Sequence, residues 1–334
     1  MRAIPLADDL FYGAVSLEHI DGGIKPWRIP YRDLALFLPN GIDSKAEICA
    51  GVRLRLRTDS TSVIIMFAPL EEAARMDCTV DGALHSTVAL LKGDSAAPFT
   101  MLPGEMADLE IFLPQNTGMT IIGLRVMSCA EFAFFPDQRP KWVTYGSSIT
   151  QCVDARSPSY TWPAIASRRS QFNLTCLGFS GNCHLEPTVA RMIRDLPADF
   201  ISLCVGINVY GAATLSPRTF KPALIGMLET IREKHSHTPL LVISPIYAPD
   251  RETTENKLGF TLIAMREEIS QTVALMQNRG DRRIFYLDGL ELLGLADADH
   301  LPDGLHPDAS GYELMADRFV DRGINALRDK GIFL

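Results

Sequence analysis

From residue 141 to the end of the chain, short apolar segments rich in β-forming residues alternate with longer segments of helical periodicity. This alternation of predicted strands and helices restricts the fold more than any other feature. Strands are predicted at 141–145, 172–177, 200–205, 240–244 and 284–287. Helices are predicted at 160–170, 187–195, 217–235, 257–278 and 309–327. A strand, a crossing helix and a second strand form the repeating unit of a parallel sheet, so we expect an α/β domain here.

The first 135 residues follow a period of two instead. The segment from Val52 to Arg57 alternates apolar residues with arginine, which predicts a strand with one buried face and one face in water. Asp81-Gly82 suits a hairpin turn. Further strands are predicted at 62–67, 77–80, 86–91, 107–113 and 120–127. Short strands at this spacing predict an all-β sandwich of jelly-roll type.

Length and composition fit two such domains. The chain has 334 residues, 47% of them hydrophobic, which is enough for two cores. Residues 132–140 contain two prolines and a charged cluster and are the expected linker. The predicted domains are therefore an N-terminal β-sandwich at 1–135 and an α/β domain at 136–334.

Polar or glycine-bearing turns follow three of the predicted strands, and a fourth precedes the last helix. They are Gly146-Ser147-Ser148, Gly178-Phe179-Ser180-Gly181-Asn182, Gly206-Ile207-Asn208 and Asp303-Gly304-Leu305-His306. The carboxyl ends of parallel strands meet at one edge of a sheet, where open α/β folds bind their ligands. We therefore expect these four turns to converge.

These residues resemble the SGNH hydrolases, a superfamily that includes the GDSL-type lipases and esterases and is named for its Ser, Gly, Asn and His. The resemblance covers about residues 140–334 and implies a flavodoxin-like three-layer α/β/α domain. The sequence Gly-Ser-Ser-Ile-Thr is similar to the branch whose hydrolase domain follows a β-rich domain. That branch includes carbohydrate acetyl esterases and at least one natural-product acyltransferase. The roles that the resemblance implies are Ser148 as nucleophile, His306 as base beside Asp303, and Gly181 and Asn208 as oxyanion-hole donors.

The same roles follow from the chemistry of the side chains. A neutral serine hydroxyl is a poor nucleophile and needs a base such as histidine to take its proton. Asp303 lies three residues before His306, a separation that brings its carboxylate beside the imidazole and fixes the tautomer. Attack on an ester creates an oxyanion, for which we expect three donors: the backbone N–H groups of Ser148 and Gly181 and the side-chain amide of Asn208.

Each assignment has an alternative. Ser147 is a second candidate nucleophile, and either serine could serve only as a helix cap. Gly178 and Gly181 could serve turn geometry alone, and Asn208 could satisfy its own turn. His306 precedes a proline and could be a structural residue at the start of the last helix.

The seven cysteines form no Cys-x-x-Cys pair, and their odd number predicts reduced thiols that act as small apolar fillers. Cys152, Cys183 and Cys204 lie near the proposed catalytic turns, so a thiol nucleophile is an alternative. Glycine-rich phosphate loops are absent, and the pair His235 and His237 lacks a carboxylate or cysteine at metal-binding spacing. We expect a site that uses no metal and no cofactor.

Charge and the N-terminal sequence bear on partners and location. A net charge of −8 argues against nucleic acid or an anionic membrane as the main partner. The N-terminus lacks the apolar stretch of a secretory signal, and no run approaches the roughly 18 apolar residues of a membrane span. The expectation is a cytoplasmic protein that acts on a small-molecule ester, with a homo-oligomer left open.

Four residues are candidates for substrate contact. Trp27 and Tyr31 stand in a proline-rich stretch at 25–33, which we expect to be a loop whose aromatic rings stack on a ligand. Asn182 and Tyr210 follow the proposed oxyanion-hole residues. The β domain could equally serve to stabilise the catalytic domain.

The sequence predicts a serine esterase that removes a small acyl group, acetyl being the first choice, from a carbohydrate or another small hydroxylated molecule through an acyl-enzyme. An acyltransferase that passes the group to a sugar or natural-product hydroxyl is the alternative, because water and alcohol differ only in which attacks second. A remote third hypothesis is a binding module that keeps the fold without the activity.

Overall fold

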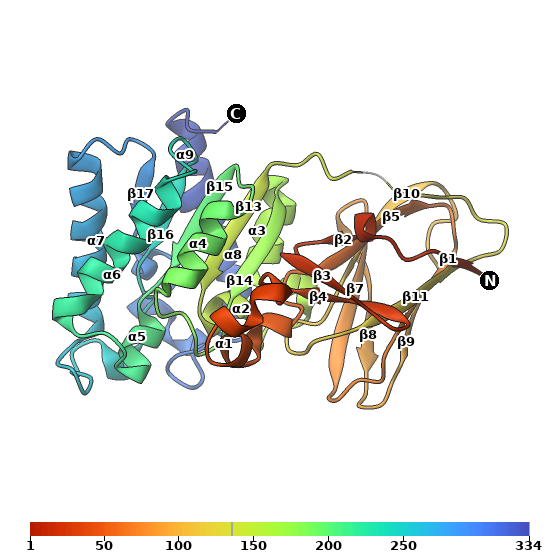
Figure 1. Cartoon of the computed structure of the whole chain (residues 1–334), viewed down its shortest axis with the longest axis horizontal. Helices are drawn as coiled ribbons and strands as arrows, with labels where there is room; N and C mark the ends of the chain where they lie inside the picture. Colours follow the sequence, from red (N-terminus) through yellow and green to blue (C-terminus); the bar gives the residue numbers. More distant parts are fainter. Residues whose placement is uncertain (135, 334) are drawn as a thin grey trace. The chain divides into compact units, whose positions relative to one another are not determined.

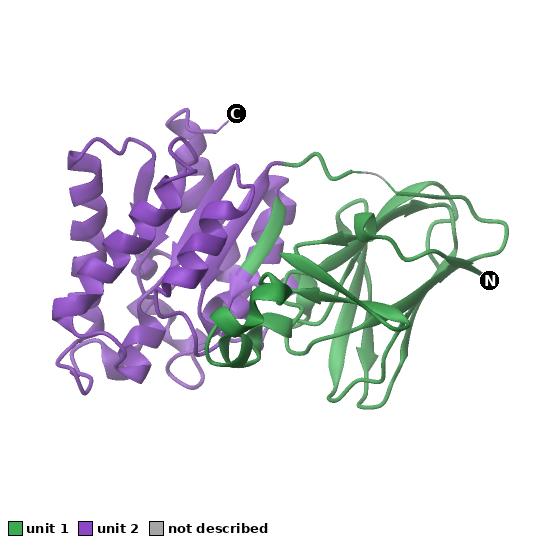
Figure 2. Cartoon of the chain, viewed as in Figure 1, with its two compact units in different colours: residues 1–139, 156–159, 173–176 green, residues 140–155, 160–172, 177–334 purple. Residues whose placement is uncertain are grey.

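The computed structural model of the chain describes residues 1–134 and 136–333, which form two compact units (Figure 2). Unit 1 contains Met1–Arg139, Arg156–Ser159 and Asn173–Cys176. Unit 2 contains Pro140–Ala155, Tyr160–Phe172 and Leu177–Leu334. The predicted domain boundary at Phe135 lies outside the described residues.

Unit 1 contains the expected all-β fold, with two antiparallel sheets of six strands (Figure 1). One sheet has the order β3-β4-β11-β6-β9 with β1 on β11, and the other has the order β12-β5-β10-β7-β8 with β2 on β5. Buried residues from both sheets form one hydrophobic core. The strands are β1 (Arg2–Ile4), β2 (Phe11–Tyr12), β3 (Ser16–Ile20), β4 (Gly23–Trp27), β5 (Arg53–Thr58), β6 (Ser62–Phe67), β7 (Ala74–Val80), β8 (Ala83–Leu90), β9 (Ala96–Thr100), β10 (Ala107–Phe112), β11 (Ile121–Val126) and β12 (Phe132–Ala133), and α1 (Asn40–Asp43) is a short helix before β5.

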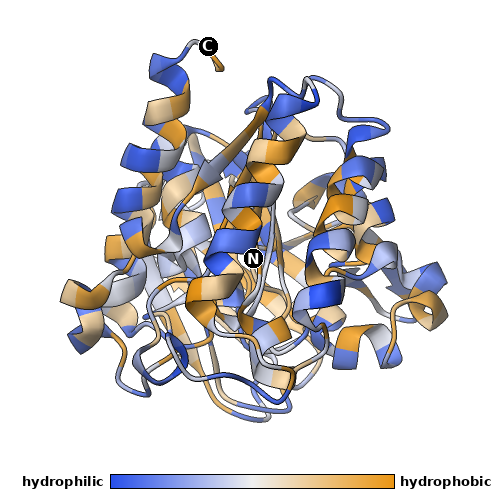
Figure 3. Cartoon of the chain, turned by 90° about the vertical axis from the view of Figure 1, so that its left-hand side faces the viewer, coloured by the Kyte–Doolittle hydropathy of each residue, from blue (hydrophilic) through white to orange (hydrophobic). Residues whose placement is uncertain are grey.

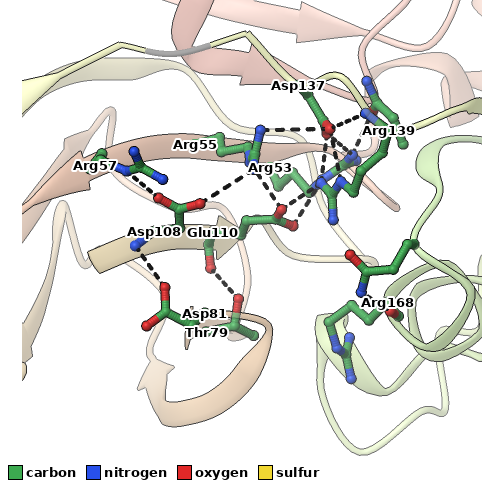
Figure 4. A network of polar contacts seen from close by, with 12 residues as sticks. Arg53, Arg55, Arg57, Thr79, Asp81, Asp108, Glu110, Asp137, Arg139 and Arg168 are labelled. Carbon is green, nitrogen blue, oxygen red and sulfur yellow. Dashed lines mark hydrogen bonds and ion pairs between the residues drawn. The ribbon is translucent and has the colours of Figure 1, made fainter. Parts of the chain in front are cut away.

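The prediction that β5 has one face in water is wrong for most of the strand. Arg53 is 1% exposed and Arg55 is 9% exposed. Both pair with Glu110 of β10, at 3.3 and 3.1 Å, and with Asp137 (Figure 4). Burial raises the pKa of Asp137, but the Arg139 and Arg53 guanidinium groups outweigh this effect and lower it overall. Alternation predicts two faces of a strand, but it does not say whether the polar face meets water or a set of opposite charges.

Two segments that we expected to be irregular contain strand residues. Phe132–Ala133 of the predicted linker forms β12, which pairs with β5. In the predicted loop at 25–33, residues up to Trp27 belong to β4, and Tyr31–Leu36 is a 3-10 helix. Pro26 is tolerated because β4 pairs with β11 only at Ile24, so the missing N–H falls beyond that ladder.

The second half of the chain contains a five-stranded sheet of order β14-β13-β15-β16-β17, as expected for an SGNH domain. The pairs between β13 and β15, β15 and β16, and β16 and β17 are parallel. Every residue of β15 and β16 is buried, as in a sheet covered on both faces. The strands are β13 (Lys141–Gly146), β14 (Asn173–Gly178), β15 (Phe200–Cys204), β16 (Leu240–Ile243) and β17 (Ile284–Leu287).

The helices of unit 2 pack in groups beside this sheet: α4 against α6, α6 against α7, and α3 against α8. In Figure 3 the helices that face the viewer carry both hydrophobic and hydrophilic residues, as elements with one packed face and one solvent face do. The helices are α2 (Ser148–Gln151), α3 (Trp162–Ser170), α4 (Pro187–Asp195), α5 (Ile207–Ala212), α6 (Pro217–Arg232), α7 (Leu262–Asn278), α8 (Ala309–Arg318) and α9 (Ala326–Asp329).

Two of the predicted helices differ most from the structure. We expected α7 from residue 257, but Gly259 has a φ of +74° and Thr261 accepts a hydrogen bond from the Ala264 N–H, so the helix starts at Leu262. The predicted last helix is instead α8, a π-helical segment at Phe319–Asn325, and α9. Among residues 1–134 and 136–333, no helix combines the length and apolar character that crossing a bilayer demands.

Candidate active site

Ser147 and Ser148 occupy a sharp turn between β13 and α2, and their hydroxyls do different things. The Ser147 side chain is buried and accepts a hydrogen bond from the Ile149 N–H at 3.2 Å, so this residue caps the helix. Ser148 is the first helical residue and is partly exposed. A side chain on Gly146 would collide with Thr150 Oγ1, only 2.1 Å from the Cβ position, which is why the turn needs glycine there.

Ser148, His306 and Asp303 form a continuous chain of hydrogen bonds. Ser148 Oγ lies 2.9 Å from His306 Nε2, and His306 Nδ1 lies 2.7 Å from Asp303 Oδ2. Burial raises the pKa of Asp303, but hydrogen bonds from the imidazole and from two backbone N–H groups outweigh it and bring the pKa down to about 2. An ionised carboxylate can only accept, so Nδ1 carries the proton and Nε2 is left to accept from the serine hydroxyl.

The loop that carries Asp303 and His306 is held from several sides. Asp303 Oδ1 accepts hydrogen bonds from the Leu305 and His306 N–H groups, at 2.9 and 2.7 Å. Gly304 has a φ of +71°, and its carbonyl accepts from the Arg251 guanidinium at 3.3 Å. The loop therefore presents the carboxylate and the imidazole together, as the three-residue spacing predicted.

The turn after β14 lies beside the nucleophile turn. The Phe179 N–H donates to the Gly146 carbonyl at 2.8 Å, and the Ser180 N–H donates to Gln151 Oε1 of α2 at 3.0 Å. Gly178 packs so closely on α2 that an added Cβ would lie 2.4 Å from the Gln151 nitrogen. Gly181 has a φ of +74°, and no atom lies within 4 Å of its Cβ position.

Asn208 joins this group from α5. Its Oδ1 accepts a hydrogen bond from the Cys183 N–H at 3.0 Å, which assigns the oxygen to the loop and leaves Nδ2 as the donor that can face a ligand. The hydrogen bonds that the Phe179 N–H donates to Gly146 and that the Cys183 N–H donates to Asn208 thus bring three predicted turns together. The turns that carry Ser148, Gly181, Asn208 and His306 therefore lie together, as expected, and the catalytic role of each residue stays a prediction.

The predicted substrate contacts have other partners. Asn182 Nδ2 donates to the Ser180 carbonyl at 2.8 Å, and the buried Tyr210 donates its hydroxyl to the Thr254 carbonyl at 3.0 Å. In unit 1, Trp27 Nε1 donates to Glu18 at 2.9 Å. The Tyr31 hydroxyl accepts from Arg32 at 3.3 Å. A role in binding for Trp27, Tyr31, Asn182 and Tyr210 stays a prediction.

The thiol alternative is unfavourable on physical grounds. Cys152, Cys183 and Cys204 are all buried. Burial raises the pKa of Cys204 to about 12 and raises the pKa of Cys183 well above its ordinary value. A buried thiol that stays protonated is a weak nucleophile, whereas Ser148 lies beside its base.

Sequence reasoning missed the residues that hold the site together. Gln151 secures the Ser180 turn, and Arg251 secures the Gly304 turn. Gln151 lies one helical turn after Ser148, a spacing that places it beside the nucleophile. No pattern in the sequence signals Arg251, because its partner is a backbone carbonyl more than fifty residues away.

Comparison with known proteins agrees with this geometry. The sequence profile of the GDSL-like lipase/acylhydrolase family matches residues 140–323, and that of the SsfX3 N-terminal domain matches residues 10–121. Among solved structures, the salicylyl-acyltransferase SsfX3 from a tetracycline biosynthetic pathway is 34% identical, with a TM-score of 0.91 over 98% of this chain and 97% of its own. No match was found among curated protein sequences.

More distant structures share the fold. A family two carbohydrate esterase from Clostridium thermocellum is 14% identical, with a TM-score of 0.70 over 96% of this chain and 99% of its own. The acetyl xylan esterase Est2A from Butyrivibrio proteoclasticus is 11% identical, with a TM-score of 0.62 over 98% and 97% of the two chains. Because the family profile matches more than half of its length, this chain belongs to the GDSL-like lipase/acylhydrolase family.

Proposed function

We propose that this protein cleaves a carboxylic ester through an acyl-enzyme on Ser148, with a small acyl group such as acetyl as the first expectation. The observation that carries the proposal is the chain from Ser148 Oγ to His306 Nε2 and from Nδ1 to Asp303, at 2.9 and 2.7 Å. These contacts are within the range that a nucleophile and its base require before substrate binds.

The first half of the reaction loads the enzyme. Ser148 Oγ attacks the ester carbonyl carbon while its proton passes to His306 Nε2, and Asp303 stabilises the imidazolium that results. The oxyanion accepts hydrogen bonds from the backbone N–H groups of Ser148 and Gly181 and from Asn208 Nδ2. When the tetrahedral intermediate collapses, His306 gives its proton to the leaving alkoxide, so that the alcohol departs and the acyl group stays on Oγ.

The second half returns the serine. A hydroxylated molecule gives its proton to His306 Nε2 as it attacks the acyl carbon, and His306 then protonates Ser148 Oγ as the ester bond to the enzyme breaks. Water as the attacking group releases an acid, which is hydrolysis. An alcohol as the attacking group produces a new ester, which is acyl transfer.

One observation favours transfer as the second candidate function. The 34% identity to a salicylyl-acyltransferase runs over nearly the whole chain, the N-terminal β domain included. The carbohydrate esterases support the fold at much lower identity. We therefore keep a sugar or natural-product hydroxyl as an acceptor, and an aromatic acyl group as a donor, beside the acetyl ester. The hydrogen-bonded state of Ser148 argues against an inactive binding module.

The test is an assay of 4-nitrophenyl acetate, butyrate, octanoate and benzoate with wild type, Ser148→Ala and Ser147→Ala. Each is run alone and with a sugar or a polycyclic polyol as acceptor. If only Ser148→Ala loses steady-state release of 4-nitrophenol, the result supports Ser148 as the nucleophile. The ranking of the four esters by rate gives the preferred acyl group. A single-turnover burst that an acceptor relieves identifies a transferase. Equal activity of Ser148→Ala and wild type contradicts the proposal.

A further inference from the structure

His184 lies in the loop between β14 and α4, three residues after Gly181, and both of its ring nitrogens have partners. His184 Nε2 lies 2.9 Å from the Gly181 carbonyl oxygen, and Nδ1 lies 3.0 Å from Thr214 Oγ1. A carbonyl can only accept, so Nε2 carries the hydrogen and Nδ1 accepts from the threonine hydroxyl. Thr214 lies two residues after the end of α5, the helix that carries Asn208. The imidazole therefore connects the Gly181 turn to the end of the Asn208 helix.

The backbone of His184 is held by the carboxylate of Glu186. Its N–H approaches both carboxylate oxygens of Glu186 at 3.3 Å, and Glu186 Oε2 accepts from the Tyr145 hydroxyl at 2.8 Å. Burial raises the pKa of Tyr145 well above its ordinary value, so this hydroxyl keeps its proton and stays a donor. Leu185 between them has a φ of +63°, the conformation that lets the Glu186 carboxylate reach back toward the His184 N–H.

Gly181 itself has little support on its outer side. The space beside its Cα is open, with no atom within 4 Å of the Cβ position, and a glycine peptide turns freely. The bond to His184 restrains the Gly181 carbonyl, and through Thr214 it does so relative to α5. The Gly181 N–H belongs to the preceding peptide, whose Ser180 carbonyl is held by Asn182 Nδ2, and the Cys183 N–H bonds Asn208 Oδ1. The His184 bond adds the restraint on the peptide that follows, and together these contacts hold the Gly181 N–H relative to the Asn208 amide.

We propose that His184 is a positioning residue for the oxyanion hole. It holds the Gly181 turn in register with Asn208 and does not itself touch the reacting atoms. This inference rests on the proposed function, because it assumes that Gly181 and Asn208 stabilise the transition state. A misplacement of about 1 Å in a catalytic group can cost about a hundredfold in rate. Loss of this restraint should therefore lower kcat and leave KM nearly unchanged.

The experiment compares His184→Ala, His184→Gln and Thr214→Val by steady-state hydrolysis of 4-nitrophenyl acetate and by inhibition with phenylboronic acid, which forms a tetrahedral adduct on the serine. We expect His184→Ala to lose about 10- to 100-fold in kcat, less than the roughly 10²- to 10³-fold typical for removal of a donor itself. Gln keeps an amide N–H for the Gly181 carbonyl and should recover most of the loss. Boronate affinity should fall in parallel with kcat/KM across the series.

His85→Ala is the matched control, because His85 Nε2 also contacts a backbone carbonyl, that of Thr100 at 3.1 Å, in unit 1. It should retain wild-type kcat. The inference is overturned if His184→Ala keeps wild-type kcat, or if it loses thermal stability and activity together with no rescue by Gln. Ser148→Ala separates the two hypotheses. If it is inactive while His184→Ala is normal, only the positioning role fails, and if it is active, the proposed function fails as well.

Discussion

Replacing Arg53 by methionine tests whether the polar face of β5 is part of the interior. The Arg53 guanidinium donates to the carbonyls of Leu174 and Gly51 at 2.9 and 3.3 Å, and to Asn173 Oδ1 at 2.6 Å, and it pairs with Glu110. Methionine fills similar space but removes the donor that these three neutral acceptors share. At about 1 kcal/mol for each lost hydrogen bond, the loss is about 3 kcal/mol, which agrees with the roughly 3–5 kcal/mol typical for breaking a buried ion pair.

The same strand supplies the control. Arg57 lies two positions from Arg55 on the same face, but its side chain is 47% exposed, and it pairs with Asp108. Solvent and salt screen such a pair, so Arg57→Met should be close to wild type. Denaturant unfolding followed by fluorescence is suited to the comparison, because Trp27 reports on unit 1 and Trp142 and Trp162 report on unit 2. Equal losses of unfolding free energy in Arg53→Met and Arg57→Met would refute the claim that Arg53 belongs to the interior.

Three further predictions concern the site and the N-terminal unit. The pKa of Asp303 is lowered from 3.8 to about 2, so its ionised carboxylate contributes stability that is complete above about pH 4 and is lost as the pH falls toward 2. The gap in unfolding free energy between wild type and Asp303→Asn should shrink over that range, and a gap that widens in acid would contradict this. Ser147→Ala should cost about 1 kcal/mol of stability through loss of the cap, with kcat within about tenfold of wild type, and a loss of turnover equal to that of Ser148→Ala would disprove the capping role. Trp27→Ala should raise KM and leave kcat and folding intact; unchanged kinetics on the true substrate would remove Trp27 from the binding site.

The secondary structure of the second half was predictable because its signals are local. The predicted helix at 187–195 and strand at 284–287 coincide with α4 and β17. In the first half, the strands with clear alternation were found, but β1 to β4, β9 and β12 were not. Those six strands are short, or carry proline and glycine, and they form because sheet neighbours pair with them.

The candidate catalytic residues could be named from the sequence for a related reason. Asp303 and His306 are three residues apart, and each oxyanion candidate follows a strand directly, so a parallel sheet must bring them to one edge. The contacts that choose between alternatives were not predictable. Ser147 and Ser148 are identical in type and adjacent, and only the geometry shows that one bonds the Ile149 N–H and the other bonds His306.

The sequence by itself determined the all-β first part and the parallel sheet that follows it, and it named the candidate serine, histidine, aspartate, glycine and asparagine. Periodicity, turn residues and close spacing are properties of short segments. Only the tertiary structure decided which polar groups face water. The arginines of β5 alternate identically, yet Arg53 is buried against Glu110 and Arg57 is exposed, because burial of a charge depends on opposite charges that arrive from distant segments. The positions of His184 and Arg251 depend in the same way on backbone carbonyls that the fold, and no sequence pattern, places beside them.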